Sequence, residues 1–261
     1  MNMLERWGAT AMLVWRELFY GFGFFWLIIR ESFRLNSHRG VGWRVVVMQI
    51  LFTGVDAVGI ILLISTSLGA VIIFYGIGLL SVNGGQSSYL YTILVTVITR
   101  ELGPLLTAFI VMARSGVAIA TELSNMVISQ EIEAYLAVGI NPISYLVVPR
   151  FLGVTVSVAA LTILFSVFGL AGAWLIVQFL QPVPAAEYFT NLLAHLSPAD
   201  VAASVAKGVA FGMVIAVVSS YQGFQAMHSS TEVPVLVIKA VGRGFALLIV
   251  VNIIITLVYL L

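Results

Sequence analysis

The sequence contains no cysteine and little charge. Without cysteine the chain has no disulfide bonds, no thiolate metal ligands and no cysteine nucleophile. Only 9% of the residues are charged, whereas 61% are hydrophobic, and the formal net charge is +1. This composition lies far outside the range of soluble globular proteins and predicts a polytopic membrane protein. The near-neutral charge, with no tract rich in Lys or Arg, argues against nucleic acid as a partner.

Motifs for nucleotide binding and metal catalysis are also missing. The pattern Gly-x-x-x-x-Gly-Lys-Ser/Thr, which cradles phosphate groups, does not occur, and neither does His-Glu-x-x-His, which binds a catalytic zinc ion. We therefore expect a membrane subunit that is not an enzyme and has no cofactor of its own. If ATP drives the protein, a separate chain must bind the ATP and its magnesium ion.

Long stretches with little or no charge separate the charged residues. A helix needs about 20 apolar residues to cross a bilayer. The stretches predict five membrane-spanning helices, near residues 45–80, 89–113 (or 89–120), 145–180, 201–226 and 236–261. The expected fold class is thus an all-α polytopic membrane protein. We expect one domain over 1–261, in which residues 1–44 precede a transmembrane bundle formed by 45–261.

The segment from Ala9 to Ile29 has the length of a span but carries Arg16 and Glu17 at its centre. A charge at the middle of the bilayer costs about 2.5–3.5 kcal/mol on insertion scales. The tryptophans in and beside this segment suit the level of the lipid headgroups. We therefore predict a helix that lies in the cytoplasmic interface rather than a sixth span.

Basic residues predict the orientation, because short loops rich in Lys and Arg stay in the cytoplasm. Four arginines between residues 30 and 44 directly precede the first predicted span, and Lys239 and Arg243 open the fifth. The connections at 81–88 and 181–200 contain no Lys or Arg. The sequence therefore predicts a cytoplasmic N-terminus and a C-terminus on the other side of the membrane. The polar segment 121–142 then lies on the cytoplasmic side, with 121–128 as the end of the second span and its exit.

That polar segment interrupts two apolar stretches and holds three of the eleven acidic residues. Its second half predicts a short amphipathic helix that ends at Gly139 and the following Asn141-Pro142, with Tyr135 and Leu136 on its apolar side. A helix at the membrane surface between two spans can dock a soluble partner. The candidate contact residues are Ser129, Gln130, Glu131, Glu133, Tyr135, Leu136 and Gly139.

A second charged motif, Arg100-Glu-Leu-Gly-Pro104, falls in the second predicted span. Ionisable residues are rare in spans and usually face a cavity or a partner helix. We predict that Arg100, Glu101 and Pro104 form the polar zone of a cavity. The alternative is that the two charges neutralise each other and the proline kinks the helix. Asp56 and Asn252 are the other deep polar residues, and Asp56 is expected to be a structural acid.

Together these motifs resemble the MlaE (YrbE) permease family. The order and spacing of the family's residues match over 100–151, in Arg100-Glu-Leu-Gly-Pro104, Ala113-Arg-Ser-Gly116, Thr121-Glu122, Ala137-Val-Gly-Ile-Asn-Pro142 and Pro149-Arg-Phe151. The predicted layout of spans agrees with that family over the rest of the chain. The resemblance maps the family's coupling helix onto Ser129 to Gly139 and its interfacial helix onto Ala9 to Ile29. An acid that some members carry in the last span is replaced here by Asn252.

The resemblance implies the permease subunit of an ABC transporter in the bacterial inner membrane. Such a transporter moves phospholipids between the inner and outer membranes and maintains the lipid asymmetry of the outer membrane. The implied partners are a second copy of the chain, two cytoplasmic ATPase subunits, a periplasmic ring of MCE-domain proteins and a small cytoplasmic accessory protein. The C-terminus would then be periplasmic.

The residues alone leave a second function open, an ion-coupled secondary transporter of a lipophilic substrate. Its relay would use Asp56, Glu101 and Glu122. Such a transporter works alone under an ion gradient, whereas a permease subunit requires a partner ATPase.

Overall fold

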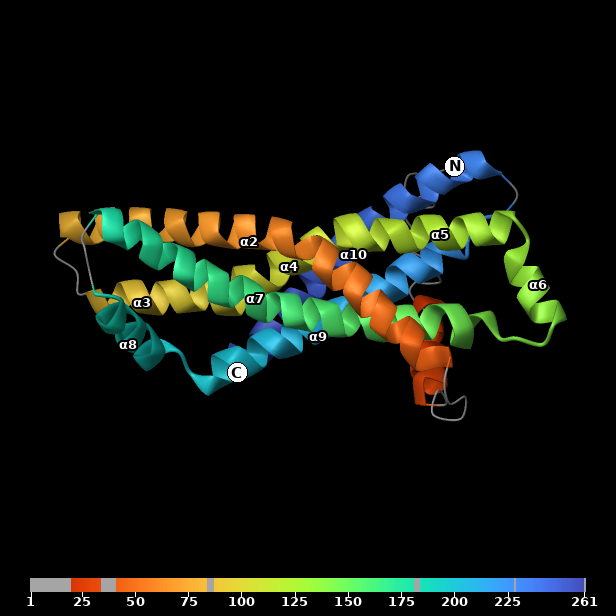
Figure 1. The fold of residues 1–261 in the computed structure, drawn as a ribbon, viewed down its shortest axis with the longest axis horizontal. Helices are drawn as coiled ribbons and strands as arrows, with labels where there is room; N and C mark the ends of the chain where they lie inside the picture. Colours follow the sequence, from red (N-terminus) through yellow and green to blue (C-terminus); the bar gives the residue numbers. More distant parts are fainter. Residues whose placement is uncertain (1–19, 34–40, 84–86, 181–183, 228, 261) are drawn as a thin grey trace, which may run out of the picture.

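A computed structural model describes residues 20–33, 41–83, 87–180, 184–227 and 229–260. Over these ranges the chain is helical and contains no strand. The long helices run side by side along one axis, and short helices lie at the two ends of the bundle (Figure 1). The prediction of an all-α protein is confirmed.

The five predicted spans are also confirmed. Each is long and apolar enough to cross a membrane, and they cover Trp43–Ile77, Leu90–Ile128, Ile143–Gln178, Pro198–Gly223 and Ser230–Tyr259. Four of them consist mainly of one long helix each, namely α2 (Val41–Asn83), α7 (Val148–Leu180), α9 (Pro198–Gly223) and α10 (Val233–Leu260). The fourth begins earlier than predicted because Ser197 and Asp200 form a capping box at its first turn.

The second span is composite and longer than predicted. Its successive segments are α3 (Ser87–Val95), a π-helical segment (Thr96–Leu102), α4 (Gly103–Val111), a second π-helical segment (Met112–Gly116) and α5 (Val117–Ile128). The span therefore continues past 113 and 120, and the prediction that 121–128 form its end and exit is confirmed. The helix continues because its polar residues find partners: Glu122 pairs with Arg150, and Ser124 donates a hydrogen bond to the carbonyl of Gly223.

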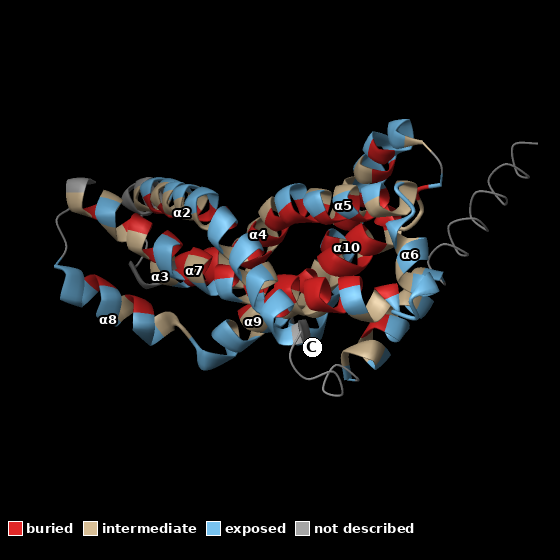
Figure 2. Cartoon of the chain, turned by 45° about the vertical axis from the view of Figure 1, so that its right-hand side comes forward, coloured by how far each residue is buried: buried red, intermediate tan, exposed pale blue. Residues whose placement is uncertain are grey.

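The contacts between the helices place some spans inside the bundle and others on its outside. Helix α7 lies between α2 and α9, and α10 packs on α9 and on the second span. Half of the most apolar window is buried in each of the second, third and fourth spans, but only 11% in the fifth. Figure 2 shows the buried residues on the sides of the helices that face their neighbours. The first and fifth spans therefore present the outer faces.

The backbones of α2 and α7 approach closely at glycine residues. A Cβ atom built on Gly69 would lie 1.9 Å from the carbonyl oxygen of Gly169, and one built on Gly172 would lie 2.7 Å from the Cα atom of Thr66. No side chain fits between the helices at these two positions. Close packing of small residues is a main source of helix association in membranes.

We expect Gly69→Ala to destabilise the bundle by about 1–3 kcal/mol, because the new methyl group must push the two backbones apart. Gly59→Ala on the same helix is a matched control, since a Cβ atom there would meet nothing within 4 Å. The control should stay within about 1 kcal/mol of the original protein. Thermal unfolding of both variants in detergent measures the difference. Equal melting temperatures would contradict the close approach of α2 and α7.

Two short helices mark the ends of the bundle (Figure 1). Helix α6 (Glu131–Ala137) lies at one end, and α8 (Ala185–His195) lies at the other. The sequence did not predict α8. Its Tyr188 is buried and donates a hydrogen bond of 3.1 Å to the carbonyl of Leu170. Burial, with a smaller contribution from Tyr91, raises the pKa of the Tyr188 hydroxyl well above its usual value.

Residues 20–33 form a helix at the α6 end. Phe25 packs on Phe151 of α7, with ring centroids 6.4 Å apart, and Phe24 packs on Tyr221 of α9. Ser144 donates a hydrogen bond to Glu31 across 2.7 Å. The second half of the segment Ala9 to Ile29 is therefore helical as predicted, residues 9–19 lie outside the described ranges, and the position of this helix in the membrane interface stays a prediction.

Candidate functional site

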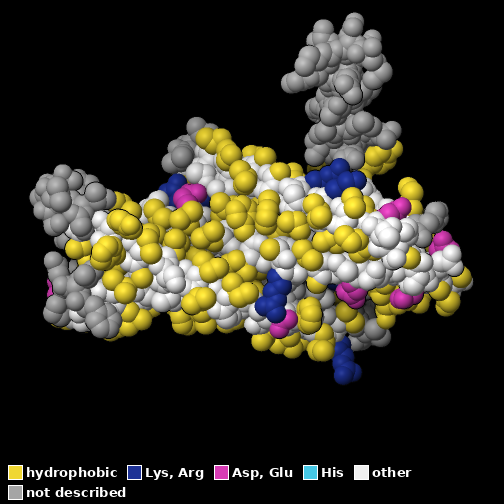
Figure 3. All heavy atoms as spheres, turned by 90° about the horizontal axis from the view of Figure 1, so that it is seen from above, with side chains coloured by type: hydrophobic (Ala, Val, Ile, Leu, Met, Phe, Trp, Pro, Cys, Tyr) yellow, Lys and Arg dark blue, Asp and Glu magenta, His cyan; other side chains and the backbone are white. Residues whose placement is uncertain are grey.

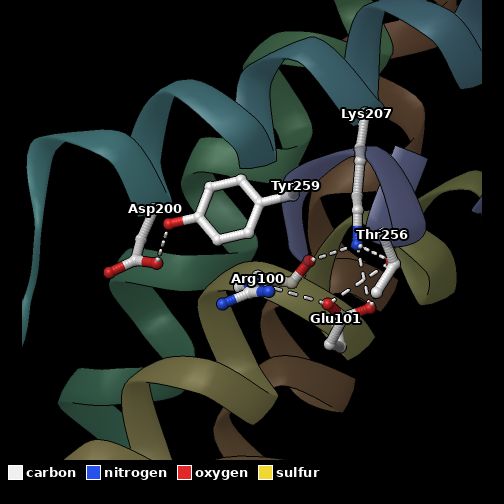
Figure 4. A network of polar contacts seen from close by, with 6 residues as sticks. All are labelled: Arg100, Glu101, Asp200, Lys207, Thr256 and Tyr259. Atoms are coloured by element: carbon white, nitrogen blue, oxygen red, sulfur yellow. Dashed lines mark hydrogen bonds and ion pairs between the residues drawn. The ribbon is translucent and has the colours of Figure 1, made fainter. Parts of the chain in front are cut away.

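A cluster of charged residues forms where the second, fourth and fifth spans meet, and we call it the Lys207 cluster (Figure 4). It consists of Arg100, Glu101, Lys207 and Thr256. The ammonium group of Lys207 lies 2.8 Å from Glu101 Oε2 and donates hydrogen bonds to Thr256 Oγ1 at 2.9 Å and to the carbonyl of Arg100 at 3.0 Å. The side chain of Lys207 is only 1% exposed. A buried ammonium requires such partners, because an unpaired charge in an apolar interior is very costly.

Arg100 extends this cluster toward the α8 end. Its Nε atom lies 3.4 Å from Glu101 Oε1, and its guanidinium group stacks 3.9 Å above the ring centre of Tyr259. The Tyr259 hydroxyl donates a hydrogen bond of 3.2 Å to Asp200 at the start of α9. A cation over an aromatic ring is held by the negative face of the ring. The guanidinium group is therefore fixed between Glu101 and Tyr259.

The local sequence explains why the carbonyl of Arg100 accepts a bond from Lys207. In an α-helix that carbonyl would bond to the N–H group four residues later, and that residue is Pro104, which has none. The π-helical turn also brings Gly103 so close to the carbonyl oxygen of Ile98 that a Cβ atom would lie 2.3 Å from it. Pro104 itself is buried at the start of α4. Its role in this site is thus to free a backbone acceptor.

The charges of the Lys207 cluster do not cancel. Among its four residues, Arg100 and Lys207 are cationic and Glu101 is the one carboxylate between them, an excess of one positive charge that is offset only on the far side of the Tyr259 ring, by Asp200. Arg100 and Glu101 are both partly exposed. The cluster can therefore attract an anion such as a phosphate group to an otherwise apolar part of the molecule.

The sequence predicted part of this site. The contact between Arg100 and Glu101 agrees with the self-neutralising alternative, but the structure adds Lys207 as the closer partner of the carboxylate. Lys207, Thr256, Tyr259 and Asp200 were missed. A signal for Lys207 was present, because a lysine inside the fourth predicted span has no acid in its own span. It therefore requires a carboxylate from another helix.

Two further ion pairs connect different helices. Arg150 on α7 lies 2.7 Å from Glu122 on α5, and it also donates a hydrogen bond of 3.1 Å to the carbonyl of Leu146. This pair ties together the two spans from which α6 projects. Asp56 on α2 lies 3.2 Å from Arg114 in the second π-helical segment, so the acid expected to be structural does have a basic partner.

The predicted docking helix at 129–139 is shorter in the structure and spans only Glu131–Ala137. Gln130 adopts the left-handed conformation, with φ 59°, so Ser129 and Gln130 form the turn before the helix. Ser129 donates a hydrogen bond of 2.9 Å to Glu131. Gly139 ends the element as predicted, with a φ of 80° that favours glycine.

The faces of α6 differ in part from the predicted ones. Ile132 and Tyr135 pack against the bundle, and Tyr135 lies 5.5 Å from Tyr145 between ring centroids. Leu136 was predicted on the same side but is 59% exposed. The prediction placed Leu136 on the packed side because it assumed a longer helix, whereas α6 spans only Glu131–Ala137. Glu131, Glu133, Leu136 and Val138 form an exposed surface that is both acidic and apolar.

Five apolar spans around a buried ion cluster, with a surface helix between two of them, define a multi-pass α-helical membrane protein. Residues 46–258 match the family model described as Permease MlaE. The chain belongs to the MlaE permease family and is an ABC transporter permease. Such subunits operate with ATPase partners.

Related proteins agree with this assignment. The chain is 28% identical over 211 residues to a probable ABC transporter permease protein of Rickettsia conorii, with 81% of each chain covered. It is 28% identical over 189 residues to the chloroplastic protein TRIGALACTOSYLDIACYLGLYCEROL 1 of Arabidopsis thaliana, covering 70% of this chain and 52% of the relative. A probable ABC transporter permease protein of Synechocystis is 32% identical over 126 residues, 48% of each chain.

Proposed function

We propose that this chain is the membrane-spanning subunit of an ABC transporter that moves phospholipids between the inner and outer membranes of a bacterium. The observation that carries the proposal is the Lys207 cluster, a net positive site among apolar spans. A phospholipid suits such a site, because its acyl chains pack on apolar surface and its phosphate binds a cation. The name of the Arabidopsis relative, which contains that of a glycolipid, supports a lipid cargo.

In the proposed orientation the α6 end is cytoplasmic and the α8 end is periplasmic, with the N-terminus inside and the C-terminus outside. Arg100 then lies ten residues from the periplasmic start of the second span at Leu90. A helical rise of 1.5 Å per residue places it about 15 Å along the helix. The cluster would receive the headgroup, and the outer faces of the first and fifth spans would contact the acyl chains. The whole chain, 1–261, acts as one unit in this proposal.

Helix α6 is the proposed contact with the ATPase. Its exposed acidic and apolar residues suit a partner with a basic and apolar groove, and none of its residues is buried in the bundle. The Glu122–Arg150 pair fixes the two helices beneath it. The expected assembly contains two copies of this chain, two ATPase subunits, an MCE-domain ring on the periplasmic side and a small cytoplasmic accessory protein.

The secondary-transporter alternative finds less support. A proton relay needs carboxylates that give up and regain a proton. Each of the three candidate acids instead lies beside a cationic side chain: Asp56 beside Arg114, Glu101 beside Lys207 and Glu122 beside Arg150. The three pairs also lie on different parts of the bundle. This arrangement favours structural and ligand-binding roles for these residues.

Reconstitution distinguishes the two functions. The purified complex, in vesicles of phosphatidylethanolamine and phosphatidylglycerol, should move labelled phospholipid only when ATP is present. The chain alone, under a proton gradient, should move none. Mass spectrometry of the purified complex should identify an ATPase subunit and bound phospholipid. Transport by the isolated chain under the gradient would refute the permease proposal and support the alternative.

A further inference from the structure

A second charged site, the Asp56–Arg114 pair, lies far from the ends of the first and second spans and away from the Lys207 cluster. Asp56 follows the start of the first span at Trp43 by thirteen residues, and Arg114 precedes the end of the second span at Ile128 by fourteen. At 1.5 Å per residue both lie about 20 Å from the α6 end of their helices. Arg100 and Arg114 are also about 20 Å apart along the second span. One lipid headgroup is too small to contact both sites at once.

The pair is unusually exposed for this depth. The Arg114 side chain is 43% exposed and that of Asp56 is 44% exposed. Facing hydrocarbon, each charge would cost about 2.5–3.5 kcal/mol. Figure 3 shows a face of the molecule that is largely hydrophobic, with charged side chains in small mixed groups. A charged pair that is exposed at this depth indicates a polar ligand or a water-filled space next to it.

The geometry leaves both side chains with unused bonding capacity. Arg114 donates from Nη1 to the backbone carbonyl of Asp56, and its Nη2 lies 3.2 Å from Asp56 Oδ2. A guanidinium group has five N–H donors, so three remain. Within the described part of the chain, no residue bonds to Asp56 Oδ1. The pair therefore presents an anion-binding fork beside a free carboxylate oxygen.

The surroundings hold Arg114 in place and leave space beside it. Arg114 lies in the π-helical segment Met112–Gly116, and the side chain of Met112 packs against Gly116 and Gly244 on the buried side. On the exposed side Ala113 and Ala118 are small, and a Cβ atom on Gly59 would meet nothing within 4 Å, whereas Phe52 and Ile60, one turn from Asp56 in either direction, are large and exposed. A π-helical turn inside a span often marks a functional position.

We propose that the Asp56–Arg114 pair is a second lipid site, at which Arg114 binds the phosphodiester of a phospholipid headgroup and Asp56 binds its ammonium or hydroxyl group. The inference rests on the proposed function as a phospholipid permease. Arg forms paired hydrogen bonds with phosphate oxygens, and its remaining donors are available for them. The free oxygen of Asp56 matches a zwitterionic headgroup such as phosphatidylethanolamine. The protein thus offers two successive headgroup sites along the second span.

Photo-crosslinking tests the site in the assembled complex. A photoreactive phenylalanine analogue at position 118 should capture radiolabelled phospholipid from vesicles of phosphatidylethanolamine and phosphatidylglycerol. Arg114→Gln should lower the capture about tenfold, because the phosphate loses its charged donor. Asp56→Asn should keep the capture but shift it from phosphatidylethanolamine toward phosphatidylglycerol. A purely structural ion pair would not change the headgroup ratio.

Three controls make the result decisive. Ser67 is an exposed polar residue on α2, the helix that carries Asp56, and Ser67→Ala should leave capture unchanged. The double variant Asp56→Asn/Arg114→Gln avoids an unpaired charge and should also lose capture while melting close to the original protein. Capture at the original level in this variant would overturn the inference, as would crosslinking to a second copy of the chain instead of lipid. If either result is found and the complex still moves phospholipid with ATP, only the inference of a second site fails. If the unaltered complex shows no ATP-driven movement of phospholipid, the proposed function itself is refuted.

Discussion

Glu101→Gln is expected to destabilise the folded protein by about 3–5 kcal/mol, because it leaves the buried ammonium group of Lys207 without a carboxylate. The amide has nearly the same shape as the carboxylate, so the loss reports on charge and not on packing. Thr256 and the carbonyl of Arg100 would remain as neutral acceptors. Thermal unfolding in detergent should show a large fall in melting temperature, which measures what the carboxylate contributes to stability.

A second variant separates stability from lipid binding. In Glu101→Gln/Lys207→Met both buried charges are absent, so much of the stability should return. Phospholipid retention should be low in this variant, because Lys207 no longer supplies a cation and Arg100 has lost the carboxylate that holds its guanidinium group in place. If the single variant melts at the same temperature as the original protein, the Lys207–Glu101 contact is not a buried ion pair. If the double variant retains phospholipid normally, the Lys207 cluster is not the headgroup site.

The spans were predictable from sequence because membrane crossing depends on local composition, and the stretches without charge are long. The Lys207 cluster was only half predictable, since Glu101 and Lys207 are 106 positions apart and no local pattern joins them. Arg100 and Glu101 drew attention because they interrupt an apolar span. The pairing of Asp56 with Arg114 and of Glu122 with Arg150 depends on the packing of different helices, which the order of the residues does not contain.

The short helices show the other limit of sequence interpretation. Helix α8 was missed because the connection 181–200 was judged by its lack of basic residues and not by the apolar spacing of Tyr188 and Leu192, which are both buried. Helix α6 was found but given too many residues. Its start depends on the left-handed conformation of Gln130. A glycine or asparagine at that position would predict this conformation, but a glutamine does not.

Reversing the charges of Glu131 and Glu133 together with Leu136→Asp is expected to abolish binding of the ATPase. A like-charge contact at an interface costs several kcal/mol, and a new carboxylate in place of an apolar contact adds desolvation cost, so affinity should fall about 100-fold or more. The bundle should fold normally, because no residue of α6 is buried. Co-purification of the ATPase and ATP-driven phospholipid movement should therefore be lost together, while the melting temperature of the isolated chain stays unchanged.

The opposite end of the molecule supplies the matched control. Glu187 is an exposed acid in the first turn of α8, so Glu187→Lys makes one reversal of the same kind far from α6. It should leave ATPase binding intact. Normal ATPase binding by the α6 variant would show that the energy of ATP enters elsewhere. The helix at 20–33 would then be the next candidate, since it lies at the same end of the bundle and is linked through Glu31 to Ser144 at the start of the third span.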